Sequence, residues 1–110
     1  MFELIINDTK HEAALSAYTL MMYEQEFGGA DMLSDLDSVV LTKDKSPSWL
    51  IVLKGAWAAL KTQDDTVPCF AEWSKTATNL NMNDIYIAIQ TEGKNVFFRD
   101  GASGSKQQKR

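Results

Sequence analysis

Two side chains of this 110-residue sequence could together carry out nucleophilic catalysis, the thiol of Cys69 and the imidazole of His11. Thiol enzymes pair a cysteine with a histidine that acts as its base, and the two can be far apart in sequence. Here His11 falls in an expected strand and Cys69 at the expected start of a helix. The sequence favours a structural interpretation, in which His11 is an edge-strand residue and Cys69 is a semi-buried thiol.

Other patterns that support chemistry are missing from the sequence. A zinc site normally needs several Cys or His ligands, and this chain has one of each. The near pairs Glu24/Glu26 and Asp35/Asp37 are two residues apart in expected helices, so their members do not share a face. The pair Gly28-Gly29 follows a helix instead of a strand, which is the wrong context for a phosphate-binding loop. We predict no catalytic, cofactor-binding or metal-binding residue and expect the protein not to be an enzyme.

The charge of the chain argues against nucleic acid and membranes as partners. The formal net charge is -4, and the last ten residues carry +3 from Lys106, Lys109 and Arg110 with no acid, which leaves -7 for residues 1–100. An acidic body repels phosphate groups. Because there is a single cysteine, no secretory signal and no apolar run of about 20 residues, we expect a cytoplasmic protein.

The elements that would position these side chains begin with a hairpin. Phe2, Leu4 and Ile6 alternate as in a half-buried strand, residues 7–10 are suited to a turn, and residues 11–15 form a weaker second strand. An isolated hairpin is marginal in water, so it must pack on helices.

Four amphipathic segments are expected to be helices. Ser16 caps the first, over residues 17–27, which Gly28-Gly29 end. Asp31 caps a short second helix, and residues 42–48 are a polar loop. Ser46-Pro47 starts the third, with Leu50, Leu53, Trp57 and Leu60 in helical spacing. The fourth begins at Phe70, where Cys69 replaces the usual capping serine and Glu72 is expected to do most of the capping.

The segment after Asp84, a potential cap, is ambiguous. Ile85, Ile87 and Ile89 alternate as in a strand, whereas Ile85, Ala88 and Ile89 share one helical face. Residues 100–110 have nothing to bury and are expected to be a flexible basic tail after a single domain at 1–99. The predicted class is α+β, mostly helical, with an N-terminal hairpin and four or five short amphipathic helices.

The chain has more tryptophan and methionine than a small core needs. The third helix is apolar on two faces, which places it centrally in the fold or gives it a partner surface. Trp and Met are favoured at binding surfaces. We therefore predict a partner-binding surface on the first and third helices around Met21, Met22, Trp49 and Trp57.

The order of these segments resembles a known family. A hairpin is followed by a helix that closes in Glu24-Gln25-Glu26-Phe27-Gly28, then by an alanine-rich helix with Trp57-Ala58 at its centre. Pro68-Cys69-Phe70 and Trp73 then open the next helix. Over roughly residues 2–90, this sequence resembles the tail assembly chaperones of long-tailed (siphovirus-type) bacteriophages and prophages. Cys69 departs from the family's serine, and the strand-like residues 85–89 depart from its last helix.

The resemblance implies a chaperone that binds the tape measure protein and helps recruit tail tube subunits during tail morphogenesis. It also implies self-association, a place in the cytoplasm of the bacterial host, absence from the mature virion, and a helix after Asp84. Two alternatives stay open: a small acidic regulatory or inhibitor protein, and a Cys-dependent small enzyme. No cofactor is expected under the first interpretation.

Overall fold

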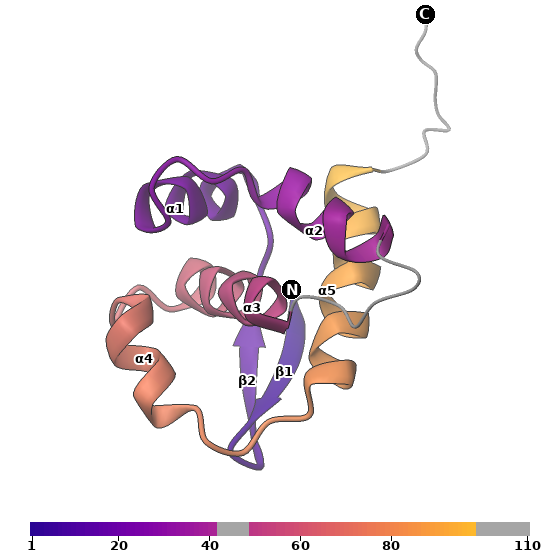
Figure 1. Ribbon diagram of the computed structural model, residues 1–110. Helices are drawn as coiled ribbons and strands as arrows, with labels where there is room; N and C mark the ends of the chain where they lie inside the picture. The colour runs from indigo at the N-terminus through magenta and orange to yellow at the C-terminus, as the bar shows by residue number, and fades with distance from the viewer. Residues whose placement is uncertain (42–48, 99–110) are drawn as a thin grey trace, which may run out of the picture.

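The computed structural model of the protein describes residues 1–41 and 49–98, with the side chains of residues 37–41 left out. The described elements are β1 (Phe2–Ile6), β2 (Thr9–Ala13), α1 (Ala17–Glu26), α2 (Met32–Leu41), α3 (Trp49–Gln63), α4 (Phe70–Thr76) and α5 (Met82–Phe97). The class is α+β and mostly helical, as predicted, and the ambiguous last segment is a helix (Figure 1). The expected polar loop at 42–48, with the Ser46-Pro47 start signal, and the expected tail at 100–110 lie outside the described residues.

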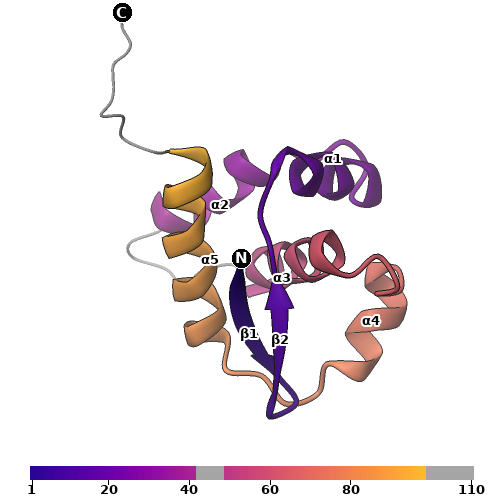
Figure 2. The same ribbon diagram turned by 180° about the vertical axis from the view of Figure 1, so that it is seen from behind.

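The hairpin turns at Asn7 and Asp8. Both have positive φ, 57° and 63°, which makes a two-residue turn of the type that matches strand twist. In the resulting register Ile6 pairs with Thr9 and Leu4 with His11. The strands lie beside different helices, β1 next to α5 and β2 on the side of α4 (Figure 2).

The turn also holds the connection between α4 and α5. The Asn7 side-chain oxygen accepts hydrogen bonds from the backbone N–H of Thr78 at 3.0 Å and of Asn79 at 2.9 Å. Its amide nitrogen donates to the carbonyl oxygen of Thr76 at 2.7 Å. One side chain therefore joins the hairpin to a loop about 70 residues later in the chain.

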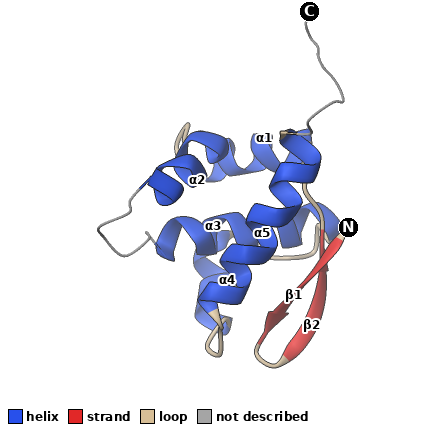
Figure 3. Cartoon of the chain, turned by 90° about the vertical axis from the view of Figure 1, so that its right-hand side faces the viewer, coloured by secondary structure: helices blue, strands red, loops and turns tan. Residues whose placement is uncertain are grey.

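Helix α3 is the centre of the fold. Residues 55–60 are all buried, and α3 packs against α1, α2, α4, α5 and β2 (Figure 3). The two apolar faces seen in the sequence are therefore explained largely by the central position of the helix. Only its first turn, at Trp49 and Leu50, leaves large apolar side chains exposed.

The predicted helix boundaries are partly confirmed. The hydroxyl of Ser16 accepts from the N–H of Tyr18, and the carboxylate of Asp31 accepts from the N–H of Leu33. Gly28 and Gly29, at φ of 67° and 91°, follow α1 in the left-handed conformation that ends helices.

Two capping predictions are wrong. The last helix begins earlier than Asp84, because the side chain of Asn81 caps it by accepting the Asp84 N–H at 3.2 Å. At α4, Cys69 makes no side-chain cap, and the first N–H is bound by Glu26 of α1 instead of by Glu72. The carboxylate of Glu72 contacts Lys75. The sequence could not reveal the role of Glu26, since it depends on how α1 and α4 pack.

Candidate functional site

The structure does not join the two side chains that could form a nucleophilic pair. His11 lies on β2 and Cys69 at the start of α4, and within residues 1–41 and 49–98 no hydrogen bond links them. The thiol of Cys69 is exposed, so its expected semi-buried position is wrong. The same ranges hold no group of three or more His, Cys, Asp or Glu side chains arranged to bind a metal ion.

The four predicted partner-binding residues divide into two pairs. Met21 and Trp49 are 43% and 37% exposed and remain available to a partner. Met22 and Trp57 are only 6% and 2% exposed, so their predicted place on the surface is wrong. Trp57 is fixed inside by its indole N–H, which donates to the carbonyl oxygen of Pro68 at 2.8 Å, and by edge-to-face contact with Phe27.

A groove that is mostly apolar runs between α2 and α5, with a volume of about 610 Å³. Leu15 and Ile89, both buried, belong to its lining, and so does Phe98, which is 65% exposed. Polar groups in the lining include Asp31 and Lys94. The remaining lining residues are Leu33, Ser34, Leu36, Gln90, Gly93 and Phe97. Apolar walls with a few polar groups are typical of sites that bind another molecule.

Polar and apolar contacts together hold α2 in place as one wall of this groove. The hydroxyl of Tyr23 on α1 donates to the carboxylate of Asp35 on α2 at 2.8 Å. Burial raises the pKa of the Tyr23 hydroxyl well above its ordinary value, and the hydrogen bond and negative charge of Asp35 raise it further. Met32, which is buried, anchors the start of α2 in the core.

A glycine in α5 leaves one position of the groove wall without a side chain. Gly93 lies within α5 and lines the groove, and a Cβ atom built there would meet no other atom within 4 Å. A larger side chain at this position would therefore extend into open space at the α5 wall of the groove without meeting the core. Because glycine is unfavourable inside a helix by about 1 kcal/mol relative to alanine, its presence here has a cost in stability.

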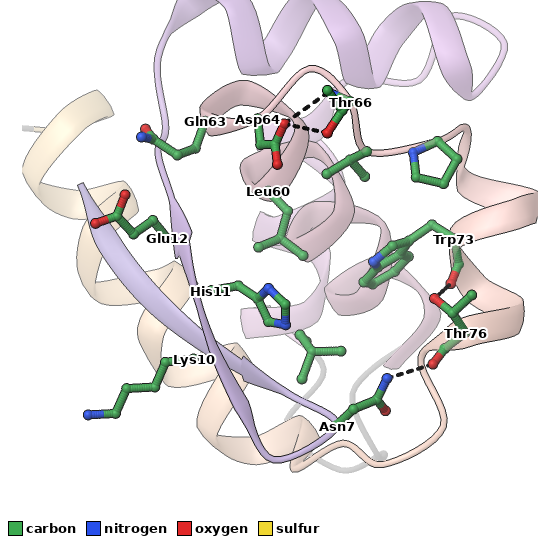
Figure 4. A pocket seen from close by; sticks show the side chains of 13 residues that line it. Asn7, Lys10, His11, Glu12, Leu60, Gln63, Asp64, Thr66, Trp73 and Thr76 are labelled. Carbon is green, nitrogen blue, oxygen red and sulfur yellow. Dashed lines mark hydrogen bonds between the residues drawn. The ribbon is translucent and has the colours of Figure 1, made fainter.

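A second cavity, a cleft of about 690 Å³, separates β2 from the end of α3 and from α4 (Figure 4). His11 points into it, toward Leu60 and Trp73. The rest of its lining is more polar than that of the groove and includes Lys10, Glu12, Gln63 and Asp64. The carboxylate of Asp64 accepts hydrogen bonds from the Thr66 hydroxyl and N–H, which lower its pKa.

Sequence reasoning missed both cavities. The exposed apolar residues it singled out lie on α1 and α3, whereas the groove is lined mainly by α2 and α5. The available signal was a run of apolar residues at the end of α5, Val96 to Phe98, which is longer than one buried helix face needs. The sequence alone does not assign this run to a face, because the segment fits both a strand and a helix by spacing.

In the part of the chain that the structure describes, no helix combines the length and the apolar character that crossing a bilayer requires. Comparison of the chain with protein-family models, curated proteins and solved structures found no match of any of the three kinds.

Proposed function

We propose that this protein is a tail assembly chaperone of a long-tailed bacteriophage or prophage, and that it binds the tape measure protein in the groove between α2 and α5. In this role it helps to recruit tail tube subunits, works in the cytoplasm of the host bacterium, self-associates, and leaves before the virion is complete. The groove is the observation that carries the proposal.

The groove suits an amphipathic helix of a partner. Two helices form its walls and mostly apolar side chains its lining, which is the arrangement that receives the apolar face of a third helix. Phe98 offers an exposed aromatic ring there, the kind of residue that anchors binding surfaces. A long helical partner with a repeated apolar face would occupy such grooves on many copies of the chaperone.

Net charge supports a holding role. The chain carries -4, and a net charge away from zero helps to keep a complex coated with many copies of it in solution. The order of elements, a hairpin and then helices, is also the order that the resemblance implies. Met21 and Trp49 provide exposed apolar side chains on two further helices, which we assign to contacts beyond the groove.

The decisive experiment is co-expression with the tape measure protein encoded in the same phage genome, with the soluble fraction of that protein as the measurement. We expect the unaltered chain to keep it soluble. Gly93→Glu places a carboxylate in the groove while replacing glycine by a good helix former, so it should abolish this effect without unfolding the chaperone. Gly93→Ala is the matched control and should retain the effect.

A second pair of variants tests the position of the site on α5. Phe98→Asp removes an exposed apolar side chain that lines the groove and should reduce binding. Ile87→Asp removes an exposed apolar side chain within α5, the helix that Phe98 directly follows; Ile87 is 52% exposed and does not line the groove, so this change should have no effect. If the unaltered chain does not solubilise the tape measure protein, or if Gly93→Glu solubilises it as well as Gly93→Ala does, the proposal fails.

A further inference from the structure

The outer edge of β2 carries backbone groups that the hairpin does not use. Because Ile6 and Thr9 flank a two-residue turn, they form a hydrogen-bonded pair, and such pairs recur at every second residue. Leu4 with His11 and Phe2 with Ala13 are the next ones. The N–H and C=O groups of Lys10 and Glu12 therefore point away from β1.

Helix α3 closes this edge at one end only. Just beyond β2, the N–H of Ala14 points the same way and donates to the carbonyl oxygen of Ala59 at 3.1 Å. The backbone groups of Lys10 and Glu12 have no such partner in the described ranges. At these residues the edge opens into the cleft, which lies between β2 and α4 (Figure 4). Unpaired edges of this kind are templates for another strand.

The two faces of the edge differ in chemistry. His11 shares the face of Leu4 and Ile6, and on this side the cleft is lined by Leu60, Val67 and Trp73. Side chains alternate along a strand, so Lys10 and Glu12 share the opposite face, which is exposed. A strand added here would direct one side chain into the cleft, toward Leu60, Val67 and Trp73, and its two neighbours toward a cation and an anion.

We propose that this cleft binds an extended segment of another polypeptide, which adds to β2 as an antiparallel third strand and carries the order basic, apolar, acidic from its N-terminus. In an antiparallel pair, residues lie directly opposite each other, and the residue that faces Glu12 precedes the one that faces Lys10. The basic residue then faces Glu12, the acidic residue faces Lys10, and the apolar residue between them enters the cleft on the side lined by Leu60, Val67 and Trp73. Each opposite-charge pair favours this order over its reverse.

This site is separate from the groove between α2 and α5 and does not depend on the tail chaperone proposal. The lining residues of the two cavities do not overlap. Charged side chains on an edge normally discourage pairing with arbitrary strands. Here Lys10 and Glu12 have opposite charges, so the edge favours a segment with the complementary charge order over one with the order reversed.

The test uses labelled, terminally blocked peptides and fluorescence anisotropy with the full chain. Ser-Val-Lys-Val-Glu-Val-Ser is the expected ligand, and Ser-Val-Glu-Val-Lys-Val-Ser, with identical composition, is the control. We expect the first to bind about tenfold more tightly at low salt, since two charge pairs change from opposite to like. With Lys10→Glu and Glu12→Lys combined in one protein, the preference should reverse.

Backbone methylation separates strand addition from other binding. The Lys and Glu residues of the peptide would direct their N–H groups at β2, whereas the central Val directs its N–H away. N-methylation at Lys or Glu should weaken binding about threefold to tenfold, and N-methylation at the central Val should not. In the unaltered protein, hydrogen exchange of the Lys10 and Glu12 amides should slow when the peptide is bound.

Three outcomes would overturn the proposal, and all come from the unaltered protein. They are failure of the expected peptide to bind, equal binding of the two charge orders, and equal loss of binding from methylation at the central and flanking positions. If the variant that combines Lys10→Glu with Glu12→Lys binds the control peptide more tightly, the result adds support. If that variant folds and still binds the expected peptide more tightly, the result contradicts the proposed register.

Discussion

A carboxylate oxygen of Glu26, in the last turn of α1, accepts a hydrogen bond from the backbone N–H of Phe70, the first residue of α4, at 2.8 Å. The first N–H groups of a helix have no partner within it and are usually bound by a nearby capping side chain. The residue in the capping position, Cys69, forms no such bond. The cap is thus supplied from 44 residues earlier in the chain, and it fixes α4 against α1.

Replacing Glu26 should therefore weaken the fold although the residue is exposed. Glu26→Ala removes the acceptor of the Phe70 N–H, and we expect a loss of about 1 kcal/mol in the free energy of unfolding. Urea denaturation measures this loss. Glu24→Ala, at a neighbouring exposed glutamate of α1, is the control and should change the stability far less. Equal effects of the two variants would contradict the capping role.

A serine at position 69 should add a cap that the structure lacks. The hydroxyl introduced by Cys69→Ser can accept an N–H later in the first turn of α4, while Glu26 keeps that of Phe70. We expect the free energy of unfolding to rise by about 0.5–1 kcal/mol. The gain should be similar in the presence and absence of Glu26→Ala, because the two side chains bind different N–H groups. Any function that needs the thiol would be lost in this variant, whereas chaperone activity should persist.

The buried hydroxyl of Tyr23 should contribute stability that depends on pH. Tyr23→Phe removes its hydrogen bond to Asp35, and we expect a loss of about 1.5 kcal/mol at neutral pH. The pKa of Tyr23 is raised in the folded state, so the folded protein keeps this proton at pH values where the unfolded chain releases it. This contribution is complete below pH 10, the ordinary pKa of tyrosine, and falls as the pH rises above it.

Denaturation at several pH values between 8 and about 11 tests whether the Tyr23 contribution to stability falls as the pH rises. Stability of the unaltered protein should fall toward the upper end of the range more steeply than that of Tyr23→Phe. Tyr18→Phe, at an exposed tyrosine of α1, should behave like the unaltered protein. Parallel curves for the unaltered protein and Tyr23→Phe would refute the prediction.

Asn7 has two separable roles in the hairpin turn. Its φ of 57° lies in the left-handed region, and its side chain binds three backbone groups of the α4–α5 connection. Asn7→Gly keeps the permitted backbone conformation but loses the side-chain bonds, for which we expect a loss of about 1–3 kcal/mol. Asn7→Ala loses both and should be less stable than Asn7→Gly by about 1 kcal/mol. Thermal and urea denaturation of the two variants separate the contribution of the side-chain hydrogen bonds from that of the backbone conformation.

Much of the architecture could be predicted from local sequence. The polar run at 7–10 located the hairpin turn, although only residues 7 and 8 form it and β2 spans Thr9–Ala13 instead of the predicted 11–15. The hydroxyl of Ser16, the carboxylate of Asp31 and the glycines at 28 and 29 act on backbone groups within a few residues, so their effect is readable without knowing the fold. The alternation of Phe2, Leu4 and Ile6 likewise predicted which face of the hairpin is buried.

Long-range packing decided the rest. Ile85 and Ile89 fit both a strand and a helix by spacing, and the helix is the form that buries them together against α3. Met21 and Met22, or Trp49 and Trp57, are equally apolar, and only the position of α1 and α3 in the fold determined which of each pair is exposed. The cap from Glu26, the groove between α2 and α5, and the cleft beside β2 follow from the same packing. Each joins segments far apart in the chain, and sequence spacing carries no information about such distances.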